Sequence, residues 1–280
     1  MKLRGDVLKQ IRRKRGLSQT ALAEGICTQA TISLMEKQDR LPKMDILTAI
    51  CERLNIQPDR IIEKEVSGIN DTFNQIIDAL TDQEFDKAKK SIDKIRVKDL
   101  NSDFDKQRYY YLLGMVQIKD GNIDDAIFNF ELVLTQFATT SANIYLAMTT
   151  AGMALAYLQR NDRERAVRLT NRSVKLIDNK KLIGSLHQWA SINCQIAELY
   201  WRLGEPEKAI DCAERGIKLC RERESLFLLD QLYMYVGRAY IELGDKEKAK
   251  ENLEIAKSLS IARHGDVMEK SIVKDLEKLQ

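Results

Sequence analysis

The sequence predicts an all-α protein with a small N-terminal helical domain followed by an array of repeated helical hairpins. Pro is scarce, at 3 of 280 residues, whereas residues that favour helices are abundant. Apolar residues recur at helical spacing through most of the chain. In the second part of the chain, small residues return at intervals of about 40, which indicates an internal repeat.

The first element that we expect is a helix from about Asp6 to Arg15. It would bury Val7, Leu8 and Ile11, and its opposite side is basic. That basic side is either a solvated face or a surface that lies along the phosphates of a nucleic acid. The second interpretation gains support from the next element.

Residues 17–40, LSQTALAEGICTQATISLMEKQDR, read as two short helices joined by a tight turn. Ser18 and Thr28 are placed to cap the two helices, and Gly25 permits a sharp reversal between them. Ile32 and Met35 would face a core, leaving the opposite side of the second helix polar. A short polar helix held in this way is the geometry that places side chains in the DNA major groove.

Two further helices complete the predicted domain. One runs from about Met44 to Leu54, and Pro58 suits the beginning of a fifth short helix that carries Ile61 and Ile62. We therefore predict a five-helix domain over residues 1–65, a linker over 66–70 and a repeat domain over 71–280. Residues 1–65 hold 13 Lys and Arg against 9 Asp and Glu, so the domain is basic, as a DNA-binding domain requires.

The two-helix stretch resembles the DNA-binding domain of Cro and lambda repressor-like regulators. The motifs that carry the resemblance are, in order, Gly16-Leu17-Ser18-Gln19, Leu22-Ala23-Glu24, Thr31-Ile32-Ser33 and Glu36. Leu34 and Gln38 depart from the pattern, because many members have a basic residue and a glycine at these positions. We expect base contacts from Gln29, Ala30, Thr31 and Ser33, and phosphate contacts from Gln19, Thr28, Arg12, Arg13 and Lys43.

The remainder of the chain repeats a pair of small residues twelve positions apart. The pairs are Gly114 and Ala126, Ala154 and Ala166, Ala197 and Ala209, and Gly237 and Ala249. Small residues at this spacing allow two antiparallel helices to approach closely. A tyrosine lies nine positions before the second member in three pairs, at Tyr157, Tyr200 and Tyr240.

This pattern resembles tetratricopeptide repeats, which form a right-handed superhelix. Residues 70–98, with Ala88, look like a degenerate first repeat, which gives five repeats, and residues 265–279 look like a terminal helix that covers the last one. The first helix of each hairpin would line the concave wall. We expect an extended peptide there, contacted by Arg108, Tyr111, Asn143, Asn193, Glu198, Trp201, Gln231 and Arg238.

Other functions have little support in the sequence. The five cysteines show no CxxC spacing, and the two histidines lie near no pattern of metal ligands, so we expect no metal, no cofactor and no catalytic site. Cys27 precedes a helix, whose N-terminus could lower the thiol pKa; the alternative is a small turn residue without reactivity. No apolar run is long enough to span a membrane, and we expect a cytoplasmic protein.

A repressor-type DNA-binding domain followed by five long repeats resembles the peptide-pheromone quorum-sensing regulators of Gram-positive bacteria, the PlcR, PrgX and Rgg group. The resemblance implies a homodimer that binds a palindromic double-stranded DNA operator and a short signalling peptide. Two alternatives remain open. One is a scaffold or inhibitor whose repeats bind a protein, and the other is a repressor that binds no small ligand.

Overall fold

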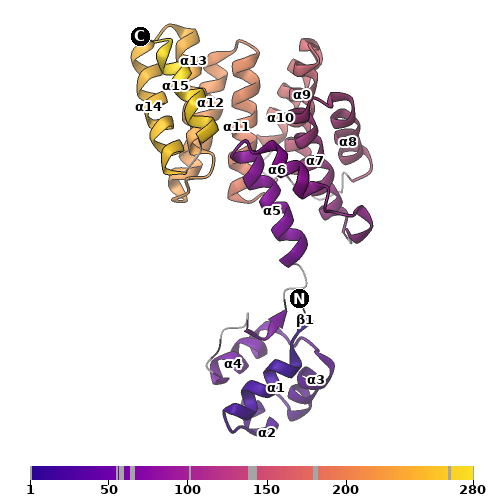
Figure 1. Ribbon diagram of the computed structural model, residues 1–280. Coiled ribbons are helices and arrows are strands. Elements are labelled where there is room, and N and C mark those ends of the chain that lie inside the picture. The colour runs from indigo at the N-terminus through magenta and orange to yellow at the C-terminus, as the bar shows by residue number, and fades with distance from the viewer. Residues whose placement is uncertain are drawn as a thin grey trace. The chain divides into compact units, whose positions relative to one another are not determined.

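A computed structural model describes residues 2–54, 56, 60–63, 67–100, 102–137, 144–178, 182–263 and 266–279. The chain divides into two compact units, Met1–Asp71 and Thr72–Gln280 (Figure 1). Both units are built mainly from helices, and the predicted fold class is confirmed. None of the described helices is long and apolar enough to cross a membrane.

The first unit contains four α-helices and a short two-stranded ladder among its described residues. In chain order these elements are β1 (Lys2–Leu3), α1 (Gly5–Lys14), α2 (Gln19–Ala23), α3 (Gln29–Gln38), α4 (Met44–Leu54) and β2 (Ile62–Glu63). Strand β1 pairs antiparallel with β2. Ile62, which we expected on a fifth helix, therefore lies in a strand, and Pro58 is outside the described residues.

The core of the first unit confirms the predicted apolar faces. Leu8 of α1, Leu22 of α2, and Ile32 and Met35 of α3 are almost completely buried in one cluster. Both predicted caps are present, because Ser18 Oγ accepts from the Ala21 amide at 3.0 Å and Thr28 Oγ1 from the Thr31 amide at 3.2 Å.

The exit from α3 uses an aspartate in the left-handed conformation. Asp39 ends the helix in the left-handed conformation, at φ 55°. Its carboxylate accepts a hydrogen bond from the Gly5 amide at 2.9 Å, which ties the end of α3 to the beginning of α1. Gly5 allows this close contact, since a Cβ atom there would lie 2.2 Å from the Met35 carbonyl oxygen.

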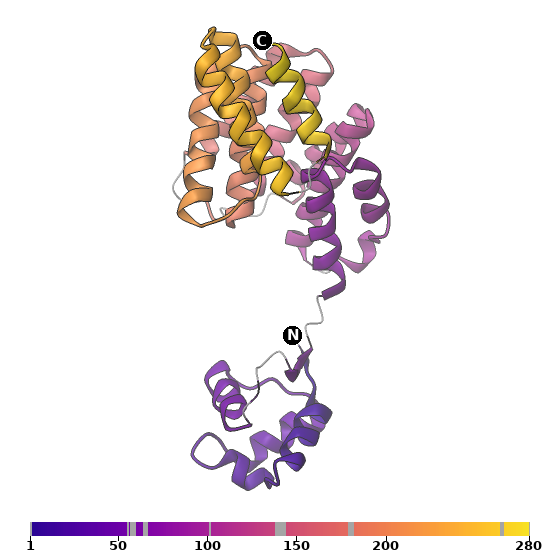
Figure 2. The ribbon, with the colours of Figure 1, turned by 60° about the vertical axis from the view of Figure 1, so that its left-hand side comes forward.

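Five successive helical hairpins and a terminal helix follow among the described residues of the chain (Figure 2). The hairpins are α5 (Ser67–Thr81) with α6 (Phe85–Ile92), α7 (Asp103–Asp120) with α8 (Ile123–Thr135), α9 (Tyr145–Gln159) with α10 (Arg163–Ile177), α11 (Leu186–Arg202) with α12 (Pro206–Glu222), and α13 (Leu229–Leu243) with α14 (Lys246–Ala262). A 3₁₀ helix, η2 (Val97–Asp99), precedes α7, and α15 (Asp266–Glu277) is the terminal helix. Residues 67–70 of the predicted linker are helical, because α5 begins at Ser67.

Each hairpin turn contains one residue in the left-handed conformation. These residues are Gln83, Gly121, Asn161, Gly204 and Gly244. Such a residue at the end of a helix lets the chain reverse within a few positions. The recurrence of this conformation in all five turns supports the count of five repeats.

A cation lies over the repeated tyrosine in three hairpins, which the sequence pattern alone did not reveal. The Arg165 guanidinium is 5.2 Å from the Tyr157 ring, the Lys208 ammonium 5.4 Å from Tyr200 and the Lys248 ammonium 5.2 Å from Tyr240. In the second repeat the tyrosine is replaced by Gln117, whose Oε1 accepts from Asn129 Nδ2 at 2.8 Å. These contacts join the two helices of one hairpin across its turn.

Candidate functional site

The outer side of α3 is polar and accessible. Gln29 and Ala30, in its first turn, are exposed, whereas Thr31 and Ser33 are half-buried. The Thr31 hydroxyl lies 2.9 Å from the Thr28 hydroxyl, so it is already engaged in the helix cap. Gln29 and Ala30 are therefore the most accessible of the four residues that we expected to contact bases.

A chain of hydrogen bonds runs from the interior of the first unit to Gln29. The Arg12 guanidinium donates from Nε to Glu36 Oε1 at 2.5 Å and from a terminal nitrogen to Glu36 Oε2 at 2.9 Å. Gln19 Nε2 donates to the same Glu36 Oε2 at 2.8 Å, and Gln29 Nε2 donates to Gln19 Oε1 at 2.7 Å. This arrangement holds the Gln29 side chain in one orientation on the surface of α3.

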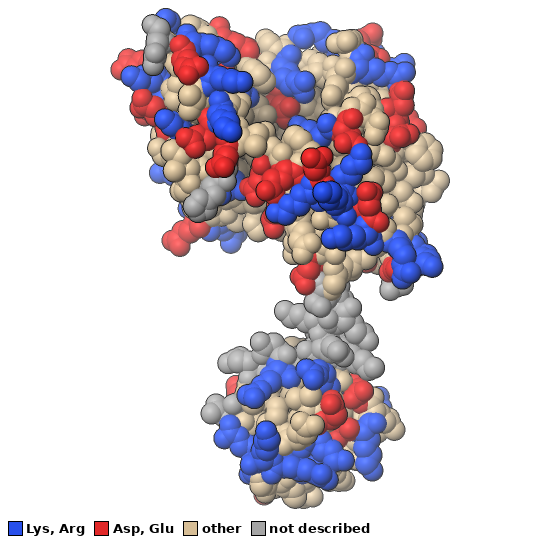
Figure 3. Space-filling view, viewed as in Figure 1, with Lys and Arg blue, Asp and Glu red and all other residues tan. Residues whose placement is uncertain are grey.

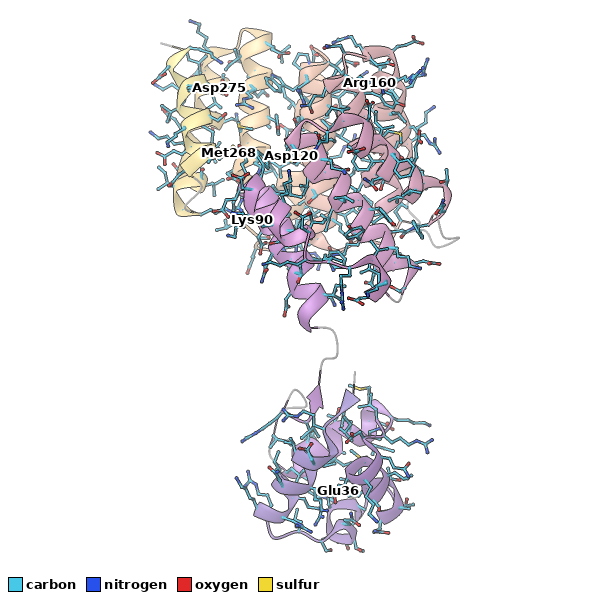
Figure 4. The ribbon with its side chains drawn as sticks, turned by 45° about the vertical axis from the view of Figure 1, so that its right-hand side comes forward. Glu36, Lys90, Asp120, Arg160, Met268 and Asp275 are labelled. Atoms are coloured by element: carbon cyan, nitrogen blue, oxygen red, sulfur yellow. The ribbon has the colours of Figure 1, made fainter. Side chains whose placement is uncertain are left out.

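The electrostatics of this hydrogen-bonded network favour the charged forms of Arg12 and Glu36. Burial opposes ionisation of Glu36, but hydrogen bonds from Arg12 and Gln19 outweigh it and lower the pKa of the carboxyl group. The hydrogen bond to Glu36 likewise raises the pKa of Arg12. The Glu36 side chain is 1% exposed and that of Arg12 is 9% exposed, so the pair is shielded from solvent and salt. Figure 4 labels Glu36 within the first unit.

The structure corrects the prediction that Arg12 contacts phosphate. Its guanidinium is buried and bonded to Glu36 and to the Leu17 carbonyl oxygen at 2.7 Å, so it positions other residues instead. Arg13, Lys43 and Thr28 are exposed, as a phosphate contact requires, and basic side chains cover much of the visible face of the first unit in Figure 3. Gln19 links Glu36 to Gln29.

Arg53 and Cys27 both lie near the C-terminal end of α2. Arg53 of α4 donates to the carbonyl oxygens of Leu22, at 3.2 Å, and Glu24, and so caps the C-terminal end of the five-residue helix α2. Cys27 is half-buried, and burial raises its thiol pKa, which argues against the activated thiol that we considered. No feature of the sequence near Arg53 reveals its contacts, because they join residues about 30 positions apart.

The second candidate site lies on the first helices of the repeats. Tyr111 of α7 is buried, and its hydroxyl accepts from Gln195 Nε2 of α11 at 2.6 Å. Arg108, one turn earlier on α7, donates to Asn74 Oδ1 of α5 at 2.8 Å and lies 4.6 Å from the Phe73 ring. Both predicted residues therefore contact other repeats in this structure.

Aromatic rings enclose another predicted residue, Arg238 of α13. Its guanidinium lies 5.0 Å from the Trp201 ring and 5.9 Å from the Tyr235 ring. It donates to Asp275 Oδ2 at 2.6 Å and to Ser271 Oγ at 2.8 Å, both on α15. Figure 4 labels Asp275 on α15. Glu198, another predicted residue, forms a salt bridge of 3.3 Å with Arg202 on its own helix.

Gln231 contacts a distant repeat, whereas Asn193 is buried inside its own hairpin. Gln231 Nε2 donates to the Thr81 carbonyl oxygen of α5 at 2.8 Å, and its Oε1 accepts from Cys194 Sγ at 3.8 Å. Asn193, which we also expected to contact a peptide, is buried beside Gly216 of α12, inside its own hairpin. Asn143 lies outside the described residues.

A groove of about 620 Å³ lies on a different face, between α12, α13 and α14. Its lining residues are Glu214, Ile217, Lys218, Arg221, Glu222, Tyr233, Val236 and Asn252, and none of them belongs to the predicted peptide site. The described residues contain no group of three His, Cys, Asp or Glu side chains that could hold a metal ion.

Comparisons with known proteins agree with this architecture. Residues 8–61 match the helix-turn-helix family, and residues 107–137, 190–223 and 231–260 match tetratricopeptide repeats. No curated protein sequence matches the chain.

Three solved structures share the fold over nearly the whole chain. PlcR of Bacillus thuringiensis, in complex with the peptide PapR7 and DNA, is 18% identical with a TM-score of 0.74, and the match covers 98% of this chain and 99% of PlcR. ComR of S. thermophilus, with DNA and its signalling peptide ComS, is 12% identical with a TM-score of 0.60, covering 98% and 99%. The pheromone receptor Rgg2 of Streptococcus dysgalactiae is 12% identical with a TM-score of 0.58, covering 98% of each chain.

Proposed function

From a helix-turn-helix unit joined to five tetratricopeptide repeats, we propose that this protein is a sequence-specific DNA-binding regulator whose repeats bind a short signalling peptide. It would bind a palindromic operator as a homodimer, because one helix-turn-helix unit contacts too few bases for high specificity. Peptide binding to the repeats would change the affinity for DNA. The proposal assigns no catalytic reaction to the protein.

The observation that carries the proposal is the orientation of Gln29 by the Arg12–Glu36–Gln19 chain. An exposed glutamine amide at the beginning of α3 offers a donor and an acceptor, which is the pattern that pairs with adenine in the major groove. Holding the side chain before DNA arrives reduces the entropy lost on binding. The fold shared with PlcR and ComR, which were crystallised with DNA and peptides, supports the same interpretation.

The experiment is to measure binding of the full chain to fluorescent DNA from upstream of its own gene, over a series of salt concentrations. Specific binding should weaken as salt rises, with a logarithmic slope of about −0.9 for each phosphate contacted. Gln29→Ala should cost about 1–3 kcal/mol of discrimination between the operator and a scrambled sequence. Gln38→Ala is the matched control, because Gln38 is an exposed glutamine at the other end of α3.

The peptide part of the proposal needs its own measurement. Short synthetic peptides taken from small open reading frames beside the gene are added to the same binding assay. One peptide that shifts the affinity for DNA would support a sensor. Specific binding that is indifferent to every peptide would leave a repressor without this ligand, and no specific binding would favour a protein scaffold.

A further inference from the structure

The turn between α5 and α6 joins the first repeat to the last. Thr81, Asp82 and Gln83 occupy this turn, and each contacts a residue at least 150 positions later in the chain. Thr81 accepts from Gln231, Asp82 accepts from Arg263 Nη2 at 3.0 Å, and Gln83 Nε2 lies 3.8 Å from Met268 Sδ. In Figure 4, Met268 of α15 lies beside the α5–α6 hairpin. We call these three contacts the latch.

Arg263 is the electrostatic centre of the latch. Its two terminal nitrogens bind different carboxylates, Asp82 at 3.0 Å and Asp230 of α13 at 2.9 Å. The Asp230 side chain is only 5% exposed, so removal of Arg263 would leave a buried carboxylate beside a second one. The pair of bridges therefore depends on a single guanidinium.

The backbone next to Asp230 is held in an uncommon conformation. Leu228, immediately before α13, has φ 57°, which is the left-handed region. A leucine adopts this conformation only where the surrounding contacts hold it. The beginning of α13, which carries Asp230, therefore depends on its contacts to keep this backbone conformation.

Gln231 also connects the latch to Cys194 of α11. Gln231 uses its nitrogen for Thr81 and its oxygen for Cys194, so one side chain joins the latch to the concave wall. Cys194 is 5% exposed, and burial, together with the charges of Glu198 and Asp230, raises the pKa of its thiol, whereas Lys119 of α7 lowers it. Helix α5 contacts α7 through Arg108 and α13 through Gln231, so it extends across this wall.

We infer that the latch is a gate that closes the concave wall around Gln231 and Cys194, and that it opens when Arg263 is released from Asp82 or Gln231 from Thr81. This inference rests on the proposed function in one respect: a peptide that binds Gln231 must take the amide from Thr81. Peptide binding and latch closure then exclude each other, and the peptide favours the open state. The apparent affinity for the peptide is reduced by the fraction of molecules that are closed.

The test uses Cys194 as a reporter and needs no peptide. The full chain is treated with iodoacetamide, and the labelling rate of each cysteine is followed by mass spectrometry. In Arg263→Gln, Cys194 should react about tenfold faster than in the unmodified chain, as expected when charge-assisted hydrogen bonds that oppose local opening are lost. Cys212, which is buried on α12, should keep its rate.

Two further variants keep the inference open to contradiction. Arg215→Gln is the matched control, since it removes an exposed bridge to Asp178 elsewhere in the repeats and should leave Cys194 unchanged. Asp82→Asn breaks one bridge while Asp230 keeps its partner, so it tests the latch even if Arg263→Gln does not fold. An unchanged rate at Cys194 in Asp82→Asn and Arg263→Gln, or an equal increase at all buried cysteines, would overturn the inference.

A peptide that shifts DNA binding in the assay above provides the second readout. It should bind Asp82→Asn more tightly than the unmodified chain, and equal affinity would contradict the competition for Gln231. If no peptide binds either protein, the peptide-sensing proposal fails, whereas the labelling rates still decide whether the latch exists.

Discussion

The ring of Phe130 on α8 lies directly against Gly114 on α7, where an added Cβ atom would be 2.5 Å from Phe130 Cε1. Gly152 on α9 faces the same ring, since a Cβ atom there would be 2.8 Å from Phe130 Cζ. Phe130 is completely buried. One aromatic side chain therefore fills the space between the second and third repeats, and the two glycines make room for it.

Substitution of Gly114 by alanine should destabilise the repeats by about 1–3 kcal/mol, because the new methyl group overpacks a filled core. Thermal unfolding of the full chain, followed by tryptophan fluorescence, measures this change, since Trp189 and Trp201 both lie in the repeats. Gly68→Ala is the control. Nothing lies within 4 Å of its added Cβ atom, so it should be neutral or stabilise by up to about 1 kcal/mol. Equal effects of the two substitutions would contradict the packing argument.

Glu36→Gln should destabilise the first unit by about 3 kcal/mol, because it leaves the Arg12 guanidinium buried without its charged partner. The same substitution should weaken DNA binding, since Gln19 loses a hydrogen bond that orients it toward Gln29. Unfolding followed through NMR methyl signals of Leu8 and Ile32 reports on this unit. Glu24→Gln, at an exposed position, serves for comparison and should change neither quantity.

The stability of the first unit should also depend on pH through Glu36. Its folded-state pKa lies below the ordinary value of 4.5, so the ionised group stabilises the folded unit at pH values above 4.5. This contribution is lost as the pH falls from 4.5 through the folded-state pKa. Urea unfolding of the unmodified chain and of Glu36→Gln at several pH values between about 3 and 6 should show the acid-dependent loss in the unmodified chain. A parallel loss in both proteins would assign it to other groups.

Cys27 should react slowly with iodoacetamide at neutral pH. Burial raises its pKa, so the thiolate is scarcer than in a free cysteine, although Cys27 is the least buried of the five cysteines. The rate should lie below that of cysteine in an unstructured peptide and above the rates of the four buried thiols. A rate faster than that of the peptide would restore the interpretation of Cys27 as a redox-sensitive residue.

The parts of the fold that the sequence predicted are those with local causes. Ser18 and Thr28 accept hydrogen bonds from residues three positions away, so the residue type and its position relative to the apolar pattern were sufficient. The repeats could also be predicted from the sequence, because each hairpin needs a small residue where its own two helices approach closely. Ala126, Ala166, Ala209 and Ala249 are all completely buried.

The roles that the sequence did not predict depend on contacts between distant segments. Arg12 looked like any other member of a basic run, and only the fold brings it to Glu36, 24 positions later. Asn193 and Cys194 are neighbours in sequence, yet one faces α12 and the other contacts Gln231. Whether a residue on the first helix of a hairpin faces the second helix or a neighbouring repeat depends on the packing angle between repeats. The repeat pattern in the sequence does not specify that angle.

The pairing of β1 with β2 makes the first unit suitable for circular permutation. Lys2 lies opposite Glu63 in this ladder, so the segments before α1 and after α4 are neighbours. A short peptide could join these two ends, and new termini could be opened between α3 and α4. Such a circularly permuted unit would keep the same core with a different order of helices, and it would separate the stability of the first unit from its attachment to the repeats.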